Sequence, residues 1–214
     1  MVAARRGLPD VVAELPQTQA ALAYATEQHD GQRRSSDGAP FIEHPIEVGW
    51  LLYRAGAPDR VVAAGILHDV LEKTPVTRAL LRRRFGKPIA KLVVAVSEDT
   101  GIASYAQRKS ALRQQVAAAG REALLVFAAD KVSKVRELRG VISSATRTHK
   151  PVKRTLIPLR RLTHFRRCLG MLEERLGEDP LVELLRTELT GLNRELKAYT
   201  EPRARRRTGL APAA

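Results

Sequence analysis

Apolar and polar positions along the chain follow a helical rather than a strand-like period. Apolar residues recur at helical spacing, as at Leu22 and Ala25, and prolines and glycines separate the segments in which they do so. The alternation typical of a β-strand is not visible. Helices are predicted over residues 17–29, 45–56, 58–74, 77–85, 88–97, 104–119, 121–139, 156–176 and 180–199. We therefore predict an all-α fold.

The same pattern indicates one domain with an extension at each end. The helical segments fill residues 17–200, and residues 1–16 are predicted to form an N-terminal extension. The segment 201–214 is basic and rich in Pro, Ala and Gly, a composition that predicts a disordered tail. At 214 residues the chain is long enough for one domain with a substantial core.

Composition narrows the class of protein. A single cysteine excludes a disulfide scaffold and a zinc site built from several cysteines. The longest apolar runs are far too short to cross a membrane, and the N-terminus lacks the hydrophobic stretch of a secretory signal. We expect a cytoplasmic protein without membrane contact.

The charge suggests the kind of partner. A net charge of +14 favours polyanions such as nucleotides, nucleic acid or acidic proteins. Because no helix-turn-helix, zinc finger or glycine-aromatic RNA motif is visible, nucleic acid is the least favoured of these. The charge alone does not say which of them the protein binds, and the sequence leaves the oligomeric state open.

Two apolar runs end at ionisable residues. The run VVAAGIL at 61–67 ends at His68-Asp69, and ALLVFAA at 123–129 ends at Asp130. Segments that are apolar all round lie inside a helical core, so each delivers a polar side chain to a buried place. A buried carboxylate without a partner costs several kcal/mol. These residues are therefore expected to be paired or to bind a metal.

A third segment, PFIEHPIEVGW, places His44 next to a helix start. Together with His68, Asp69 and Asp130 it offers two imidazoles and two carboxylates. This ligand set suits a divalent transition metal such as Mn, Fe or Zn rather than Ca or Mg. Glu72 follows His68 by one helical turn and is placed to act as general base. A surface His-Asp pair and a simple Asp130-Lys131 ion pair remain the alternatives.

The order of these residues resembles the HD-domain phosphohydrolases. Within them it is most similar to the hydrolase domain of the RelA/SpoT family and to the small alarmone hydrolases, over about residues 17–170. The matching residues are His29, Gln32, Arg33, Arg34, 40–45, Leu67, His68, Asp69, Glu72, Ala129, Asp130, Lys131 and Arg136. The resemblance implies a single-domain HD-type helical bundle and a Mn²⁺ ion held by His44, His68, Asp69 and Asp130. It also implies a nucleotide as the partner, namely (p)ppGpp, from which the 3′-pyrophosphate is removed.

One departure from the family falls beside the expected metal ligands. The family carries Glu-Asp after the HD pair, both linked to catalysis, whereas this chain carries Glu72 and Lys73. Lys73 could form a salt bridge with Asp69 one turn earlier, or it could contact a substrate phosphate. A nucleotide sensor that binds without hydrolysis is the alternative function.

Further basic residues are candidates for substrate binding. Arg34 aligns with the family's substrate-contacting arginine, and Lys134 stands where the family has an asparagine that faces the nucleoside. Arg160, Arg161 and His164 fall where relatives place phosphate-binding residues, although the basic stretch around them could equally be a solvated face.

Overall fold

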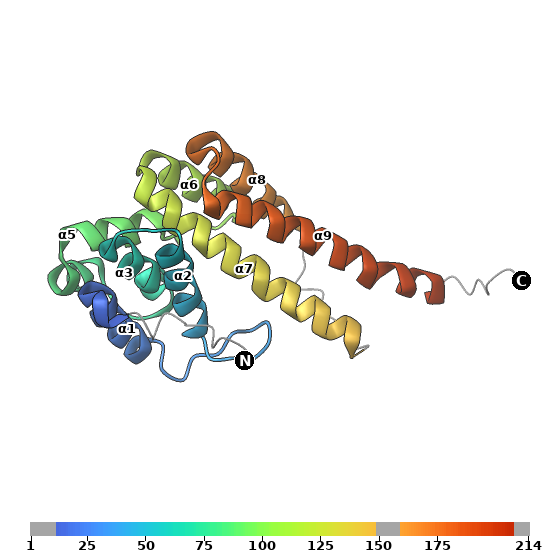
Figure 1. Ribbon diagram of the computed structural model, residues 1–214, viewed down its shortest axis with the longest axis horizontal. Coiled ribbons are helices and arrows are strands. Elements are labelled where there is room, and N and C mark those ends of the chain that lie inside the picture. The colour runs from blue at the N-terminus through green and yellow to red at the C-terminus, as the bar shows by residue number, and fades with distance from the viewer. Residues whose placement is uncertain (1–11, 149–158, 208–214) are drawn as a thin grey trace, which may run out of the picture.

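The fold is seen in a computed structural model, which describes residues 12–148 and 159–207, with side chains up to residue 200. The long helix α7 (Arg121–Arg147) runs through the molecule (Figure 1). The first helices of the chain pack on one side of it, and α6, α8 and α9 lie on the other. The remaining elements are a 3-10 helix (Val12–Glu14), α1 (Pro16–Gln28), α2 (Glu43–Arg54), α3 (Asp59–Leu67), α4 (Val70–Lys73), α5 (Arg78–Val96), α6 (Tyr105–Ala118), α8 (Leu159–Leu176) and α9 (Pro180–Arg207).

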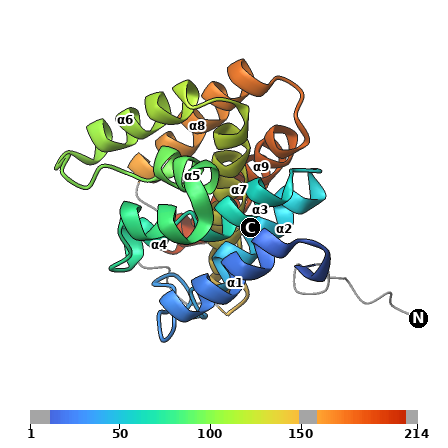
Figure 2. The ribbon, with the colours of Figure 1, turned by 90° about the vertical axis from the view of Figure 1, so that its left-hand side faces the viewer.

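The prediction of an all-α fold is confirmed, since the described part of the chain contains helices and no strand. Viewed from the side, α7 lies at the centre with the other helices around it (Figure 2). None of the helices within residues 12–148 and 159–207 combines the length and the hydrophobicity that a membrane crossing requires.

Several predicted boundaries were wrong. The helix predicted over 58–74 is interrupted at His68 and Asp69, between α3 and α4, so these two residues lie at a bend. Helix α9 continues to Arg207, into the segment that was predicted to be a disordered tail. The start predicted at 156 for the next-to-last helix lies outside the described residues. The break predicted at 85–88 is present, because Gly86 has a φ of 78° within α5.

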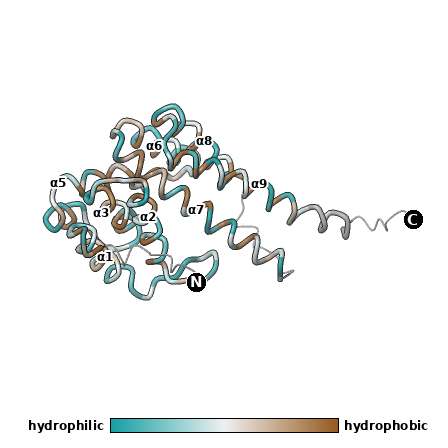
Figure 3. Tube along the Cα trace, viewed as in Figure 1, coloured by the Kyte–Doolittle hydropathy of each residue, from teal (hydrophilic) through white to brown (hydrophobic). Residues whose placement is uncertain are grey.

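The core is built around α3 and the first half of α7, along which hydrophobic residues recur (Figure 3). Residues 61–67 and 123–129 are all buried, as a segment that is apolar all round requires. His68 and Asp69 directly follow the first run, and Asp130 directly follows the second. These polar side chains therefore lie at the edge of the hydrophobic core.

A glycine sets the distance between α2 and α3. A Cβ atom added at Gly65 would lie 2.3 Å from Leu52 Cδ1 and 3.3 Å from Val48 Cγ1. Both distances are below ordinary carbon contact, so any larger residue at position 65 would force Leu52 or the helices themselves to move. The approach brings His44, on α2, next to His68, at the end of α3.

A candidate metal centre at the end of a cationic cavity

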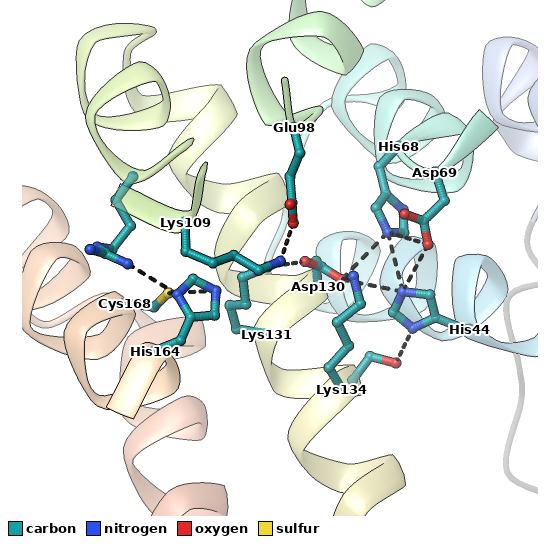
Figure 4. Close-up of polar contacts among 12 residues, drawn as sticks. His44, His68, Asp69, Glu98, Lys109, Asp130, Lys131, Lys134, His164 and Cys168 are labelled. Atoms are coloured by element: carbon teal, nitrogen blue, oxygen red, sulfur yellow. Dashed lines mark hydrogen bonds and ion pairs between the residues drawn. The ribbon is translucent and has the colours of Figure 1, made fainter. Parts of the chain in front are cut away.

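Four side chains from three parts of the chain converge on one point. The first turn of α2 supplies His44, the bend between α3 and α4 supplies His68 and Asp69, and the middle of α7 supplies Asp130. All four side chains point toward one another (Figure 4). Their exposed fractions are only 2–5%, so the cluster lies inside the helical core.

The distances within the cluster are those of groups that share a ligand. The Nε2 atoms of His44 and His68 lie 3.1 Å apart. Asp130 Oδ1 lies 3.2 Å from His44 Nε2 and 3.4 Å from His68 Nε2. Asp69 Oδ2 lies 3.5 Å and 3.2 Å from the same two nitrogens. His44, His68 and Asp130 form a group that could hold a metal ion.

The other ring nitrogens show which way the lone pairs point. His68 Nδ1 lies 2.7 Å from the Gly65 carbonyl oxygen, which only accepts, so Nδ1 must carry the proton. His44 Nδ1 lies 2.8 Å from Ser133 Oγ, and that hydroxyl donates its own hydrogen to Glu47. His44 Nδ1 therefore carries a proton too. When both rings are neutral, the lone pairs of the two Nε2 atoms face each other and repel. A proton or a metal ion between the two nitrogens would remove this repulsion.

The carboxylates add to this requirement for positive charge. Asp130 Oδ1 is buried, and its cationic partner in the described part of the chain is the Lys134 ammonium, 2.8 Å away, without a hydrogen bond of good geometry. Two imidazole nitrogens and two carboxylate oxygens are a donor set that fits a divalent transition metal. The residues present therefore fit the metal that the sequence pattern predicts.

Without a metal, protons and two lysines supply the positive charge. The Lys131 ammonium lies 2.5 Å from Asp130 Oδ2, so the Asp130-Lys131 ion pair considered from the sequence is present. Burial alone lowers the pKa of His68, but the charges of Asp69 and Asp130 raise it to about 10. Burial likewise lowers the pKa of Lys134, and the same two carboxylates more than reverse this. The Lys134 ammonium lies 2.8 Å from Asp130 Oδ1. Burial lowers the pKa of His44, and the positive charge of Lys134 adds to that effect.

The cluster opens into a cavity of about 650 Å³, large enough for a nucleotide. The loop before α2 and the helices α4, α6, α7 and α8 contribute residues to its walls. The lining residues are Gln32, Arg33, Arg34, Ser35, Phe41, His44, Asp69, Glu72, Lys73, Glu98, Tyr105, Lys109, Lys131, Lys134, Glu137, Arg161, His164 and Phe165. Basic side chains outnumber acidic ones in this set, so the cavity favours an anion.

Glu72 and Lys73 both line the cavity beside the cluster. Glu72 Oε1 accepts a hydrogen bond of 2.7 Å from the Glu98 backbone N–H, which fixes the carboxylate at the cavity wall. Lys73 is exposed and forms no ion pair among the described residues, and its backbone carbonyl accepts from Gln32 Nε2. The alternative that Lys73 is tied up in a salt bridge with Asp69 is therefore wrong.

The structure gathers most of the predicted substrate-binding residues. Arg34, Lys134, Arg161 and His164 all line the cavity. Arg160 does not; it is exposed, and its guanidinium lies over a ring of α6, 4.9 Å from the centroid of Tyr105.

His164 differs in character from the cations around it. Burial lowers its pKa to about 2, and the positive charge of Lys131 adds to this effect. The Arg113 guanidinium donates to His164 Nδ1 at 3.1 Å, so the ring proton lies on Nε2. His164 is therefore neutral and adds no charge to the cavity, and its Nε2 atom lies 3.5 Å from Cys168 Sγ.

Sequence reasoning missed several cavity residues. Glu98 binds Arg108 at 2.9 Å and also contacts the Lys109 ammonium. The apolar run 92–96 ends close to Glu98, so the signal that pointed to His68 and Asp130 is present there in a shorter form. Tyr105 and Lys109 lie on α6, whose sequence has no feature that would identify them as cavity residues.

The fold and the site together define a helical protein with a buried His/Asp cluster at the base of a cavity in whose lining basic side chains outnumber acidic ones. The comparisons with known proteins agree: residues 21–153 match the family described as the HD domain. This match covers more than half of the chain, and the chain therefore belongs to the HD domain family.

Several proteins to which this chain is similar carry names that describe their activity. A Mycoplasma pneumoniae protein named probable guanosine-3′,5′-bis(diphosphate) 3′-pyrophosphohydrolase is 40% identical over 97 residues, 45% of this chain and 13% of that protein. The Danio rerio 3′-pyrophosphohydrolase MESH1 is 36% identical over 121 residues, 54% of this chain and 65% of that protein. The chain thus spans less than two thirds of either relative.

A solved structure supports the fold. The structure of a metazoan ortholog of SpoT aligns with a TM-score of 0.67 and covers 85% of this chain and 96% of that one. At 24% identity, this likeness bears on the fold alone.

Proposed function

We propose that the protein is a Mn²⁺-dependent phosphohydrolase that removes the 3′-pyrophosphate from guanosine pyrophosphates or a related nucleotide. The observation that carries this proposal is the cavity of about 650 Å³ with a His/Asp cluster at its base and basic side chains along its walls. The names of the relatives supply the substrate class.

His44, His68, Asp69 and Asp130 would hold the ion, whose identity as manganese is part of the proposal. When bound, a divalent ion polarises phosphoryl oxygens and makes water a better nucleophile near neutral pH. Glu72 acts as general base in this proposal: Oε1 is held by the Glu98 amide, and Oε2 has no protein partner in the described part.

Lys73 stands where the family carries an aspartate, so its role cannot be taken from the family. It lines the cavity next to Glu72, and no carboxylate among the described residues forms an ion pair with its ammonium. We propose that it contacts a phosphate of the substrate and attracts its negative charge equally in the ground state and the transition state. Lys134 adds positive charge beside the cluster, and Arg34 and Arg161 add it elsewhere on the cavity wall.

A sensor that binds nucleotide without cleaving it is the less favoured function, since the named relatives are hydrolases. A cytoplasmic location stays a prediction.

An assay of pyrophosphate release from ppGpp by the purified protein with Mn²⁺ tests the proposal, with His68→Ala as control. Turnover well above that of the control is expected, and turnover no higher would contradict the proposed activity. A wild-type protein that binds ppGpp without turnover, combined with activity in Lys73→Asp, would instead establish the sensor.

A further inference from the structure

His44 makes its second polar contact away from the proposed metal. Its Nδ1 atom lies 2.8 Å from the hydroxyl of Ser133, which is only 1% exposed. Ser133 follows Asp130 by three residues on α7, so one face of that helix carries both a proposed ligand and this hydroxyl. The contact therefore lies on the far side of the His44 ring from the cluster.

Glu47 determines which group donates in the hydrogen bond between His44 and Ser133. Ser133 Oγ lies 2.7 Å from Glu47 Oε2, and a carboxylate can only accept. The hydroxyl proton is thus committed to Glu47, and Ser133 must accept from His44 Nδ1–H. Glu47 follows His44 by three residues on α2, so the three groups close a short bridge between α2 and α7.

The carboxylate of Glu47 is itself held from the other side. Arg136 Nη1 lies 3.3 Å from Glu47 Oε1, and Arg136 Nε lies 2.7 Å from Glu188 Oε1 on α9. The arginine ties Glu47 to the C-terminal helix and leaves Oε2 directed at Ser133. The orientation of the hydroxyl is therefore set by ion pairs between three helices.

We propose that Ser133 and Glu47 are positioning residues for His44: they lock the ring rotation and the Nδ1–H tautomer, so that the Nε2 lone pair faces the metal. Partners of this kind on metal-binding histidines contribute about 10–100-fold to metal affinity. This inference rests on the proposed metal site, and the tests below separate the two.

Calorimetric titration of the metal-free protein with Mn²⁺ gives the first test. Ser133→Ala removes the acceptor, so its affinity should fall by about 10–100-fold. Ser133→Thr keeps a hydroxyl and should stay close to the wild type. Ser143→Ala makes the same change at an exposed position of α7 and should also bind like the wild type. Wild-type affinity in Ser133→Ala, or an equal loss in Ser133→Thr, would overturn the proposal.

A second readout needs no metal at all. Long-range ¹H–¹⁵N correlation spectra of the metal-free protein, recorded well above the ordinary histidine pKa, distinguish the two ring tautomers. His44 should carry its proton on Nδ1. In Glu47→Ala the Ser133 hydroxyl is free to donate to the ring, so the Nε2–H form should gain population.

These measurements separate the two proposals. An Nε2–H tautomer in the wild type, or an unchanged tautomer in Glu47→Ala, would overturn the positioning role. If the wild type shows the expected tautomer yet binds no Mn²⁺, the proposed metal-dependent function fails and the hydrogen-bond relay stands.

Discussion

Gly65→Ala tests whether the close approach of α2 and α3 is as tight as the structure shows. The added Cβ atom would lie 2.3 Å from Leu52 Cδ1, whereas carbon atoms in contact are about 3.5–4.0 Å apart. Leu52 is fully buried, so it cannot simply turn into solvent. Overpacking of this kind costs about 1–3 kcal/mol.

The opposing effect is helix propensity, which favours alanine over glycine by about 0.8–1.0 kcal/mol. Gly140→Ala supplies the matched control, because Gly140 lies within α7, is exposed, and has no atom within 4 Å of an added Cβ. The propensity gain is common to both variants. The difference between them therefore isolates the overpacking, and Gly65→Ala should be about 1–3 kcal/mol less stable than Gly140→Ala.

Urea denaturation followed by circular dichroism measures both free energies of unfolding. Chelator is included, because a bound metal would add its own stabilisation to the folded state. A difference between the two variants below about 0.5 kcal/mol, well under the expected cost of overpacking, would refute the argument that Gly65 sets the helix distance.

Three further predictions concern the site. Glu72→Gln keeps an acceptor for the Glu98 amide but removes the general base, so kcat should fall by about 10²–10⁴-fold while the melting temperature stays unchanged. An unchanged kcat would exclude Glu72 as the general base. Lys73→Ala should raise KM for ppGpp by about tenfold and leave kcat nearly unchanged, because uniform binding is lost; steady-state kinetics that show an unaltered KM would contradict the phosphate contact. Metal binding must displace the proton that the carboxylates hold on His68, whose pKa is raised to about 10 in the metal-free protein. Mn²⁺ affinity should therefore rise with pH up to that value, and titrations that show no rise above neutral pH would contradict this.

The same pKa shift has a consequence for the metal-free fold. Since the folded-state pKa of His68 is above its ordinary value of 6.5, the protonated form stabilises the fold fully below that value. This contribution is lost as the pH rises from 6.5 through about 10, so the metal-free protein should become less stable over that range.

The helices and the gathering of the four proposed ligands could be predicted from local pattern. Two runs that are apolar all round had to be buried, so the residues at their ends, His68-Asp69 and Asp130, had to meet polar partners. The bend at His68 was missed, because the α3 helix period continues smoothly into α4 in the sequence and only tertiary packing interrupts it.

Which face of a helix meets the cavity could not be predicted. Arg160 and Arg161 are neighbours in the sequence, yet consecutive residues point about 100° apart on a helix. Only the rotation of α8 about its axis places Arg161 at the cavity wall and Arg160 outside it. Ser133 and Glu47 are ordinary helix residues in the sequence, and their contact depends on the packing of α2 against α7.

Anomalous diffraction from a crystal grown with Mn²⁺ tests the central claim most directly. The account predicts one strong anomalous peak about 2 Å from His44 Nε2, His68 Nε2 and Asp130 Oδ1, an ordinary metal–ligand distance, with Asp69 completing the set. A map without a peak among these four side chains, or with the ion held elsewhere in the cavity, would contradict it.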